Sequence, residues 1–268
     1  MNAPQRISQL IQKGSLSLND VSVEFAQAGV VAASNITLHI SPGEFVSIVG
    51  PSGCGKTTLL NYGAGLLPPH VCKGKFLVSG KPPQAGNRDI AYMLARDALS
   101  PWRTALGNAE LGCEIRGVPK DERRRRAADL LAKVGLAGFE DVYPKALSHG
   151  MRQRVALART FAMDAPILLM DEPFGALDAQ TRLSMQALLL SLWDRRRSTV
   201  LFVTHDVDEA LILADVVYVM SAAPGRIIRR IDVDTPRPRA VDRLDQAFLD
   251  RRAHIIGLLR QQHVTDIT

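Results

Sequence analysis

The sequence predicts an α/β fold: a mostly parallel β-sheet covered by helices, with early antiparallel strands and an inserted helical lobe. Three observations support this class. Short apolar strand candidates alternate with helical patterns along much of the 268 residues. The first two candidates, 16–25 and 35–40, alternate apolar and polar residues as antiparallel strands do. The stretch 95–159, rich in Ala, Leu and Arg, predicts the helical lobe.

The remaining elements follow in order along the chain. Residues 45–49 form a nearly continuous apolar run that ends at Gly50, which predicts a buried parallel strand leading into a loop. A turn signal at 223–225 precedes the last two elements, a strand at 226–233 and a helix at about 245–262. The other strand candidates are 75–78, 90–94, 167–170, 199–204 and 216–220.

The loop after residue 49 carries the strongest motif, because it matches G-x-x-x-x-G-K-[ST] between a predicted strand and a helix. Its glycines let consecutive backbone N–H groups point inward at a phosphate, and the helix N-terminus adds positive potential. We expect Lys56 to reach the β- and γ-phosphates and Thr57 to complete a Mg²⁺ shell. Cys54 is either a small space-filling residue or a thiol activated by the helix N-terminus. The predicted ATP-binding residues here are Gly50, Pro51, Ser52, Gly53, Cys54, Gly55, Lys56, Thr57 and Thr58.

Two adjacent carboxylates, Asp171 and Glu172, end the apolar strand candidate at 167–170. Read alone, an apolar strand that ends in Asp-Glu is equally well a simple strand exit. Paired with the phosphate loop it becomes the Walker B pattern. We expect Asp171 to hold Mg²⁺ through water, and Glu172 to orient or deprotonate the water that attacks the γ-phosphate.

Between these motifs, residues 147–154 read Leu-Ser-His-Gly-Met-Arg-Gln-Arg, which resembles the signature sequence of the ABC ATPases. The resemblance covers nearly the whole chain. It implies a P-loop NTPase (RecA-like) core with an N-terminal antiparallel β subdomain and an inserted α-helical subdomain. Phe25 takes the position of the adenine-stacking aromatic, residues 175–178 resemble the D-loop that ends in Asp178, and His205 takes the position of the switch histidine that contacts the γ-phosphate.

Some of these assignments have simpler alternatives. Phe25 is alternatively a core residue, and Asp178 alternatively only caps the helix that follows it. For Ser148 no such choice arises, because capping a helix from Gly150 and presenting that N-terminus to phosphate are the same geometry. A lone histidine is usually structural, but His205 follows an apolar strand at the family's switch position, which favours the phosphate contact.

The resemblance also implies partners. In this family the signature of one subunit, here Ser148, His149, Gly150 and Met151, closes over the ATP held by the other. We therefore expect a head-to-tail dimer, either a homodimer or a pair with a related ATPase subunit, beneath integral membrane permease subunits. The segment 91–104, with Pro101-Trp102, resembles importers of the nitrate, sulfonate and taurine group. That implies indirect work with a periplasmic or extracellular solute-binding protein. Trp102 is expected at the permease contact, with simple packing as the alternative.

Two positions depart from the family pattern. Ala95 stands where the family has the Q-loop glutamine, and a methyl group contacts neither Mg²⁺ nor the attacking water. We hypothesise that Arg96 or a backbone carbonyl substitutes, or that hydrolysis is slower. His149 stands where the signature has its first glycine, so a side chain enters a place normally kept for backbone approach to phosphate.

The charge, the apolar stretches and the cysteines of the sequence limit which partners and locations we expect. The net charge of +6 is spread along the chain, and its dense basic run, 123–126, predicts a solvated helix face or, alternatively, contact with a partner or phospholipid headgroups. We expect no nucleic-acid partner. The N-terminus lacks the apolar region of a secretory signal, and the apolar stretches are too short to span a bilayer, which predicts a protein that stays inside the cell. The family resemblance then implies a peripheral position at the cytoplasmic face of the inner membrane. The three cysteines favour neither a disulfide framework nor a zinc site.

The alternatives to a transport ATPase are a soluble ABC ATPase that acts on ribosomes or DNA, and a low-turnover regulatory subunit. The first usually carries tandem cassettes or large insertions, and this sequence has neither. Ala95 keeps the second open, whereas Glu172 and His205 argue against it. The expected division of the chain is an N-terminal extension (1–15), the first part of the ATP-binding core (16–94), the helical subdomain with the signature (95–159), the second part of the core (160–225) and a C-terminal strand and helix (226–268).

Overall fold

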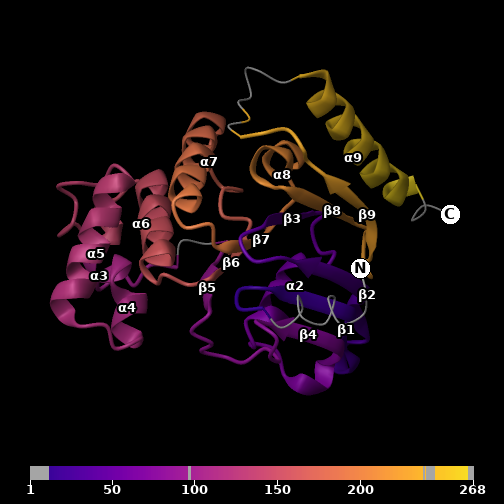
Figure 1. The fold of residues 1–268 in the computed structure, drawn as a ribbon, viewed down its shortest axis with the longest axis horizontal. Helices are drawn as coiled ribbons and strands as arrows, with labels where there is room; N and C mark the ends of the chain where they lie inside the picture. The colour runs from indigo at the N-terminus through magenta and orange to yellow at the C-terminus, as the bar shows by residue number, and fades with distance from the viewer. Residues whose placement is uncertain (1–11, 96–97, 238, 240–244, 265–268) are drawn as a thin grey trace.

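The structure is a computed structural model that describes residues 12–95, 98–237, 239 and 245–264. Part of the expected N-terminal extension and the proposed substitute Arg96 therefore lie outside the described residues. Within them, the chain forms two sheets and a set of helices arranged around them (Figure 1). This is the α/β fold that the sequence predicts, with a mixed sheet whose strands are mostly parallel.

The larger sheet has six strands in the order β5-β6-β7-β3-β8-β9. The strands from β5 to β8 pair in parallel, and β9 pairs antiparallel with β8 at the edge. All residues of β3, β6, β7 and β8 are buried, because helices or the second sheet cover both faces. The bounds are β3 Phe45–Val49, β5 Ile90–Met93, β6 Ile167–Asp171, β7 Thr199–Thr204, β8 Val216–Met220 and β9 Ile227–Asp232.

The smaller sheet is antiparallel, with β1 (Leu16–Phe25) between β2 (Val30–Ile40) and β4 (Cys72–Val78). β1 has the predicted bounds, whereas β2 and β4 are longer than predicted: β2 begins five residues before the expected Asn35, and β4 begins at Cys72. The strand expected at 75–78 is β4, but it does not join the parallel sheet. It pairs with β1 from Leu16↔Val78 to Val23↔Cys72, a choice of partner that a strand pattern alone does not specify.

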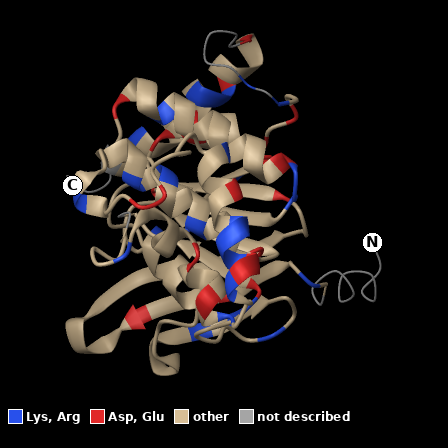
Figure 2. Cartoon of the chain, turned by 90° about the vertical axis from the view of Figure 1, so that its left-hand side faces the viewer, with Lys and Arg blue, Asp and Glu red and all other residues tan. Residues whose placement is uncertain are grey.

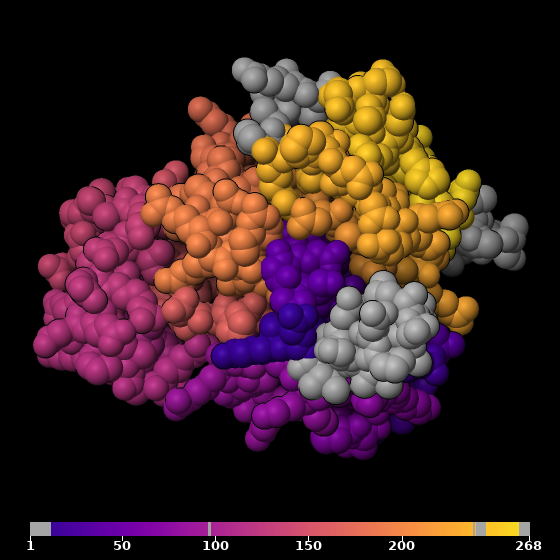
Figure 3. All heavy atoms as spheres, viewed as in Figure 1, coloured from indigo at the N-terminus to yellow at the C-terminus, as the bar shows by residue number. Residues whose placement is uncertain are grey.

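The helices fall into two groups. α2, α7, α8 and α9 accompany the six-stranded sheet, whereas α3 to α6 form the helical lobe beside β5 (Figures 1 and 3). The predicted boundary at residue 159 falls inside α6, which continues to Ala162 and packs against β5. The bounds are α2 Lys56–Gly63, α3 Ala105–Ala109, α4 Leu111–Ile115, α5 Lys120–Lys133, α6 His149–Ala162, α7 Ala179–Asp194, α8 Val207–Leu213 and α9 Gln246–Val264, with 3₁₀ turns at Ala26–Ala28, Pro69–Val71 and Pro144–Ala146.

Two surface expectations have clear outcomes. The basic run of 123–126 lies on α5, where Arg123 and Arg126 pair with carboxylates and Arg126 also donates to the carbonyl of Ala162. Basic and acidic residues both occur along this lobe (Figure 2), so it is mixed in charge rather than uniformly basic. Trp102 is 75% exposed, which rules out the simple packing alternative. No helix within the described ranges is long and apolar enough to cross a membrane.

Candidate functional site

The phosphate loop connects β3 to α2, and close backbone packing explains its glycines. Gly55 has φ of +96°, and a Cβ atom there would lie 2.3 Å from the carbonyl oxygen of Ala32. A Cβ on Gly50 would lie 2.9 Å from the carbonyl oxygen of Met220. A side chain at either position would therefore displace backbone of β2 or β8. Cys54 is 1% exposed and burial raises its pKa, so the space-filling interpretation holds over the activated thiol.

Lys56 begins α2, and its side chain lies within the phosphate loop. Its Nζ donates to the carbonyls of Gly50 and Pro51, at 2.8 Å each. The same ammonium lies 3.6 Å from Oε1 of Glu172. Lys56 is only 4% exposed, so these contacts compensate a buried positive charge. The loop thus holds a cation where the motif predicts phosphate binding.

The end of β6 brings Asp171 beside Thr57 of α2. The Thr57 hydroxyl donates to Oδ1 of Asp171 at 2.9 Å. Asp171 is 5% exposed, and burial raises the pKa of its carboxyl, while the bond from Thr57 acts in the opposite direction. Thr57 belongs to the phosphate-loop motif and Asp171 to the Asp-Glu motif. The fold therefore brings together the two residues that are expected to share a metal.

Glu172 and His205 form the second contact of the site. Nδ1 of His205, after β7, lies 2.8 Å from Oε2 of Glu172, after β6. Glu172 has φ of +42°, an unfavourable backbone conformation for a residue with a side chain, and its N–H donates to the carbonyl of Val203. The positive φ turns Glu172 out of the strand direction and toward His205. One carboxylate therefore faces both Lys56 and the histidine.

Lys56, Thr57, Asp171 and Glu172 line one cleft of about 370 Å³, and His205 reaches it through its contact with Glu172. Ala95, which follows β5 and departs from the family pattern, lines this cleft. The parallel order of β6, β7 and β3 explains the convergence, because parallel strands deliver their carboxyl ends to one edge of the sheet. The lining residues are Ser52, Gly53, Gly55, Lys56, Thr57, Thr58, Ala95, Asp171 and Glu172.

Other predicted site residues lie elsewhere. Phe25 is half-buried at the end of β1 and does not line the cleft among the described residues. Asp178 caps α7 by accepting from the N–H of Thr181 at 3.0 Å, as its simpler alternative stated. The Thr181 side chain first, and then this N–H, lower the pKa of the Asp178 carboxyl by hydrogen bonding. Ser148 to Met151 begin α6 in the helical lobe, and they too are outside the cleft lining.

The signature segment has its own geometry at the start of α6. Ser148 is exposed and is the N-cap, and its hydroxyl accepts from the N–H of Met151 at 3.2 Å. The helix begins at His149, one residue before the predicted Gly150. Nδ1 of His149 lies 3.3 Å from Nη2 of Arg152, whereas its Nε2 is buried without a hydrogen-bond partner among the described residues.

The sequence profile of the ABC transporter family matches residues 33–175, which include the phosphate loop, the signature segment and both carboxylates. The chain belongs to the ABC transporter family.

Relatives agree with this assignment over most of the chain. An uncharacterized ABC transporter ATP-binding protein of Methanocaldococcus jannaschii is 48% identical over 89% of this chain and 88% of its own length. The taurine import ATP-binding protein TauB of Yersinia pseudotuberculosis is 39% identical over 87% of this chain and 93% of its own. The chain is thus an ABC transporter ATP-binding subunit.

The fold comparison gives the same result. A dimeric, post-hydrolysis structure of the ATP-binding cassette MJ0796, bound to ADP and Pi, superposes with a TM-score of 0.70 and 32% identity. It covers 82% of this chain and 100% of the cassette. This ABC chain is therefore an ATPase, with the fold of a P-loop cassette.

Sequence analysis missed one backbone contact of the ABC site. Gly225, in the turn before β9, packs on the phosphate loop, where an added Cβ would lie 2.0 Å from the carbonyl oxygen of Cys54. Its own carbonyl accepts from the N–H of Ser34 in β2. The sequence predicts only a turn at 223–225, because Pro-Gly gives no signal for which segment lies opposite it.

It also missed two polar links between α7 and α8. Arg182 donates to Asp206 at 2.9 Å, and Gln186 donates to Glu209 at 3.2 Å. Burial raises the pKa of Glu209 to about 7, partly offset by hydrogen bonds from Thr204 and Gln186. Asp206 directly follows His205 and caps α8, so these links join the helix after the D-loop to the helix after the switch histidine. A polar residue on an amphipathic helix gives no sequence signal of its partner.

Proposed function

We propose that the chain is the ATP-hydrolysing subunit of an ABC importer, in which ATP binding closes a head-to-tail dimer and hydrolysis reopens it. The observation that carries the proposal is the convergence of Lys56, Asp171, Glu172 and His205 on one sheet edge. Thr57 contacts Asp171 at 2.9 Å, and Glu172 contacts His205 at 2.8 Å. Two carboxylates, an ammonium group and an imidazole thus lie close together beside a phosphate-binding loop.

In the proposed mechanism the backbone N–H groups of the loop bind the phosphates of ATP. Lys56 exchanges its contacts with the Gly50 and Pro51 carbonyls for oxygens of the β- and γ-phosphates. That exchange also frees Glu172 from its 3.6 Å contact with the ammonium. Nucleotide binding and release of the carboxylate are therefore coupled through one side chain.

Thr57 and Asp171 fit a Mg²⁺ ion, because both present hard oxygen atoms that already lie within hydrogen-bond distance of each other. When bound, the ion would neutralise charge on the phosphates. Glu172 accepts a proton from the attacking water, and His205 orients Glu172 and contacts the γ-phosphate. His205 is half exposed, with 51% of its side chain accessible, so this contact is open to a ligand.

The dimer is proposed because the signature residues are outside the cleft of their own chain. Ser148, His149, Gly150 and Met151 of one copy would cover the ATP held by the other copy, with Phe25 stacking on the adenine of its own nucleotide and Asp178 contributing from the D-loop. The N-terminus of α6, capped by Ser148, supplies the positive potential for a phosphate. The dimeric MJ0796 cassette supports pairing of this kind.

The transport role extends to a membrane partner. Because TauB of Yersinia pseudotuberculosis is a taurine import protein, we assign this chain to importers of the nitrate, sulfonate and taurine group. Exposed Trp102 is the proposed anchor for an integral permease subunit, which a solute-binding protein would load, with the ATPase at the cytoplasmic face of the inner membrane. The proposed units are those expected from sequence: 1–15, 16–94, 95–159, 160–225 and 226–268.

A mixture of two variants tests the composite site. Lys56→Ala disables the phosphate loop and Ser148→Ala weakens the signature, so each variant alone is expected to be nearly inactive. In a mixed head-to-tail dimer both defects fall in the same site, and the other site is intact. An equimolar mixture should therefore recover about a quarter of wild-type ATPase activity, since half of the dimers are mixed and each has one working site.

The control is a mixture of Lys56→Ala with Glu172→Ala. Both defects then affect the nucleotide cleft of their own chain, so each mixed dimer has two damaged sites and no activity returns. If Lys56→Ala with Ser148→Ala also gives no recovery in dimers confirmed by light scattering, the signature does not act across the interface.

Ala95 favours a second candidate, a low-turnover regulatory ABC ATPase. It lines the cleft with a methyl group where the family has glutamine. ATP turnover by the complex with its permease, measured with and without loaded solute-binding protein, separates the two functions. Stimulated turnover supports the importer, whereas ATP binding with no turnover in either condition supports the regulatory subunit.

A further inference from the structure

Helix α8 links the switch histidine to the C-terminal part of the chain. It has only seven residues, and its N-cap Asp206 directly follows His205. A helix this short is not stable by itself, so its position depends on contacts with the rest of the protein. At its N-terminal end, Arg182 donates to the carboxylate of Asp206 at 2.9 Å. The contacts at its other end come from residues 233–239.

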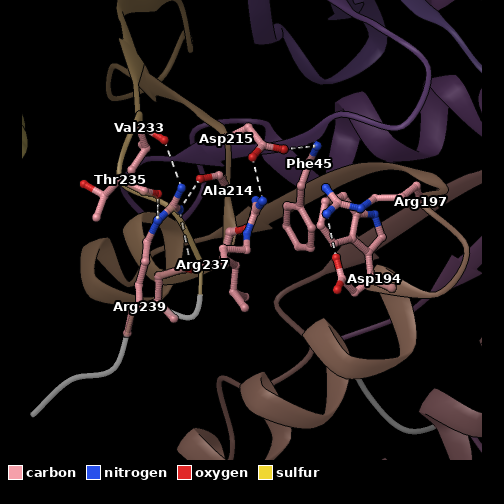
Figure 4. Close-up of polar contacts among 12 residues, drawn as sticks. Phe45, Asp194, Arg197, Ala214, Asp215, Val233, Thr235, Arg237 and Arg239 are labelled. Atoms are coloured by element: carbon pink, nitrogen blue, oxygen red, sulfur yellow. Dashed lines mark hydrogen bonds and ion pairs between the residues drawn. The ribbon is translucent and has the colours of Figure 1, made fainter. Parts of the chain in front are cut away.

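Arg239 binds the C-terminal end of α8 through backbone carbonyls (Figure 4). It donates to Leu211 at 2.9 Å and also to Ala214. Its other nitrogens donate to Val233 at 2.9 Å and Thr235 at 2.8 Å, which ties the helix end to the strand exit after β9. Arg239 is 9% exposed. Burial lowers the pKa of its guanidinium to about 10, so it stays charged at neutral pH beside the negative end of the helix dipole.

Arg237 makes a second contact beside it. Its Nε donates to the carbonyl of Leu213 at 3.0 Å, and its Nη1 to Asp215 at 2.6 Å. The guanidinium carbon lies 4.7 Å from the ring centroid of Trp193 and 5.8 Å from that of Phe45 (Figure 4). Asp215 also accepts from the N–H of Phe45. Arg237 therefore joins the end of α8 to β3, the strand that leads into the phosphate loop.

Helix α9 completes the contact along the side of α8. It packs against α8, and Arg252 pairs with Asp208 at 2.5 Å in the first turn. In Figure 3 the C-terminal residues lie directly on the second part of the core. The C-terminal segment thus touches both ends of the helix whose N-cap follows His205, although the ABC family profile ends at residue 175.

We propose that Arg237 and Arg239 are positioning residues for ATP hydrolysis: they fix the end of α8 and through this short helix hold His205 against Glu172. The proposal rests on the proposed role of His205 at the γ-phosphate. A short hydrogen-bonded helix moves as a unit, so loosening the carbonyls of Leu211 to Ala214 frees the N-cap and the histidine before it. The C-terminal segment would then be part of the catalytic geometry, without touching ATP.

Hydrogen exchange and steady-state kinetics of full-length Arg239→Gln test the proposal. Amides 206–213 should exchange about tenfold faster, because the glutamine cannot bind the four carbonyls at once. Amides 56–63 of α2 should be unchanged. The ATPase kcat should fall about tenfold, with the KM for ATP within about twofold, because the phosphate loop is intact. Arg239→Lys, which keeps the charge, should recover part of kcat.

Arg230→Gln is the matched control. Arg230 lies in β9 of the same C-terminal segment and pairs with Asp232 of the same strand, and both side chains are half exposed. This variant should leave exchange in α8 and kcat unchanged. If Arg239→Gln behaves like this control, or if exchange rises equally in α2 and α8, the positioning role is wrong.

Arg252→Gln keeps the proposal testable if Arg239→Gln does not fold. The Arg252–Asp208 pair is exposed, so its loss should not threaten folding. We expect exchange at 206–209 and kcat to change about twofold in this variant. No change in either quantity would contradict the proposal. His205→Ala separates the two claims: if it keeps full ATPase activity, the proposed function of His205 fails, whereas the exchange result for α8 stands independently.

Discussion

The nucleotide cleft and the signature segment differ in how complete each is within one chain. In the cleft, residues from three distant parts of the sequence meet: Lys56 contacts Glu172, and Glu172 contacts His205. At the signature, Ser148 contacts its own helix, and His149 has a buried nitrogen without a partner among the described residues. The parallel strand order thus assembles the cleft within one chain, whereas the signature segment lies at the start of α6, outside the lining of that cleft.

The largest expected effect comes from a substitution in the nucleotide cleft. Glu172→Gln removes the proposed proton acceptor but keeps the size of the side chain, so kcat should fall by about 10²- to 10⁴-fold. Retention of ATP should stay near wild type, because Lys56 and the loop are unchanged. Steady-state turnover and equilibrium nucleotide binding measure the two effects. Glu122→Gln on exposed α5 is the control; a Glu172 variant as active as this control would remove Glu172 from the mechanism.

A buried carboxylate behind the cleft gives the next effect. Glu209 is 3% exposed and burial raises its pKa from 4.5 to about 7. Between these values the unfolded chain releases a proton that the folded chain keeps, so the free energy of unfolding falls as pH rises, by about 3 kcal/mol in all. Below 4.5 both states are protonated and the loss is absent.

Glu209→Gln removes this pH dependence. Relative to wild type, the variant should gain stability as pH rises from about 5 to about 8, measured by urea unfolding at both values. Glu122→Gln, at an exposed position on α5 of the helical lobe, serves as the comparison. If the difference in the free energy of unfolding between wild type and Glu209→Gln is the same at both pH values, the pKa of Glu209 is not raised in the folded protein.

A smaller effect sharpens the signature side of the comparison. His149→Gly removes an imidazole whose Nε2 has no hydrogen-bond partner in the described part of the chain, and we expect it to open the N-terminus of α6 to phosphate. We expect the ATP concentration for half-maximal dimerisation to fall about threefold. Analytical ultracentrifugation at increasing ATP measures it, with exposed His254→Gly as control. An unchanged midpoint would mean that the histidine is tolerated at the rim of the interface.

An effect of similar size is expected at the cleft wall. Ala95→Gln restores the amide that the family has at this position, and we expect kcat to rise about threefold, because a polar group can then orient water in the cleft. Turnover assays compare it with Ala137→Gln at an exposed position. Equal rates in the two variants would show that the missing glutamine does not limit hydrolysis.

Several elements were predictable because their signals are local. One such signal spans about a dozen residues and consists of the apolar run of β3, the glycines of the loop and the start of α2. Another is the pair of adjacent carboxylates at the end of β6. Strand partners were not predictable, because an alternating pattern does not specify its neighbour: β4 pairs with β1 rather than with the parallel sheet. For the same reason, the contact of Gly225 with the phosphate loop was not predictable from the sequence.

The sequence by itself determined the fold class, the phosphate loop and the order of the chemical groups, since these depend on local periodicity and short motifs. Only the tertiary structure decided that Glu172 faces His205, that Gln186 meets Glu209 and that Arg239 binds the end of α8. Such contacts join residues far apart in the chain. Their energy depends on burial and on the direction of each side chain, which exist only once the layers have packed.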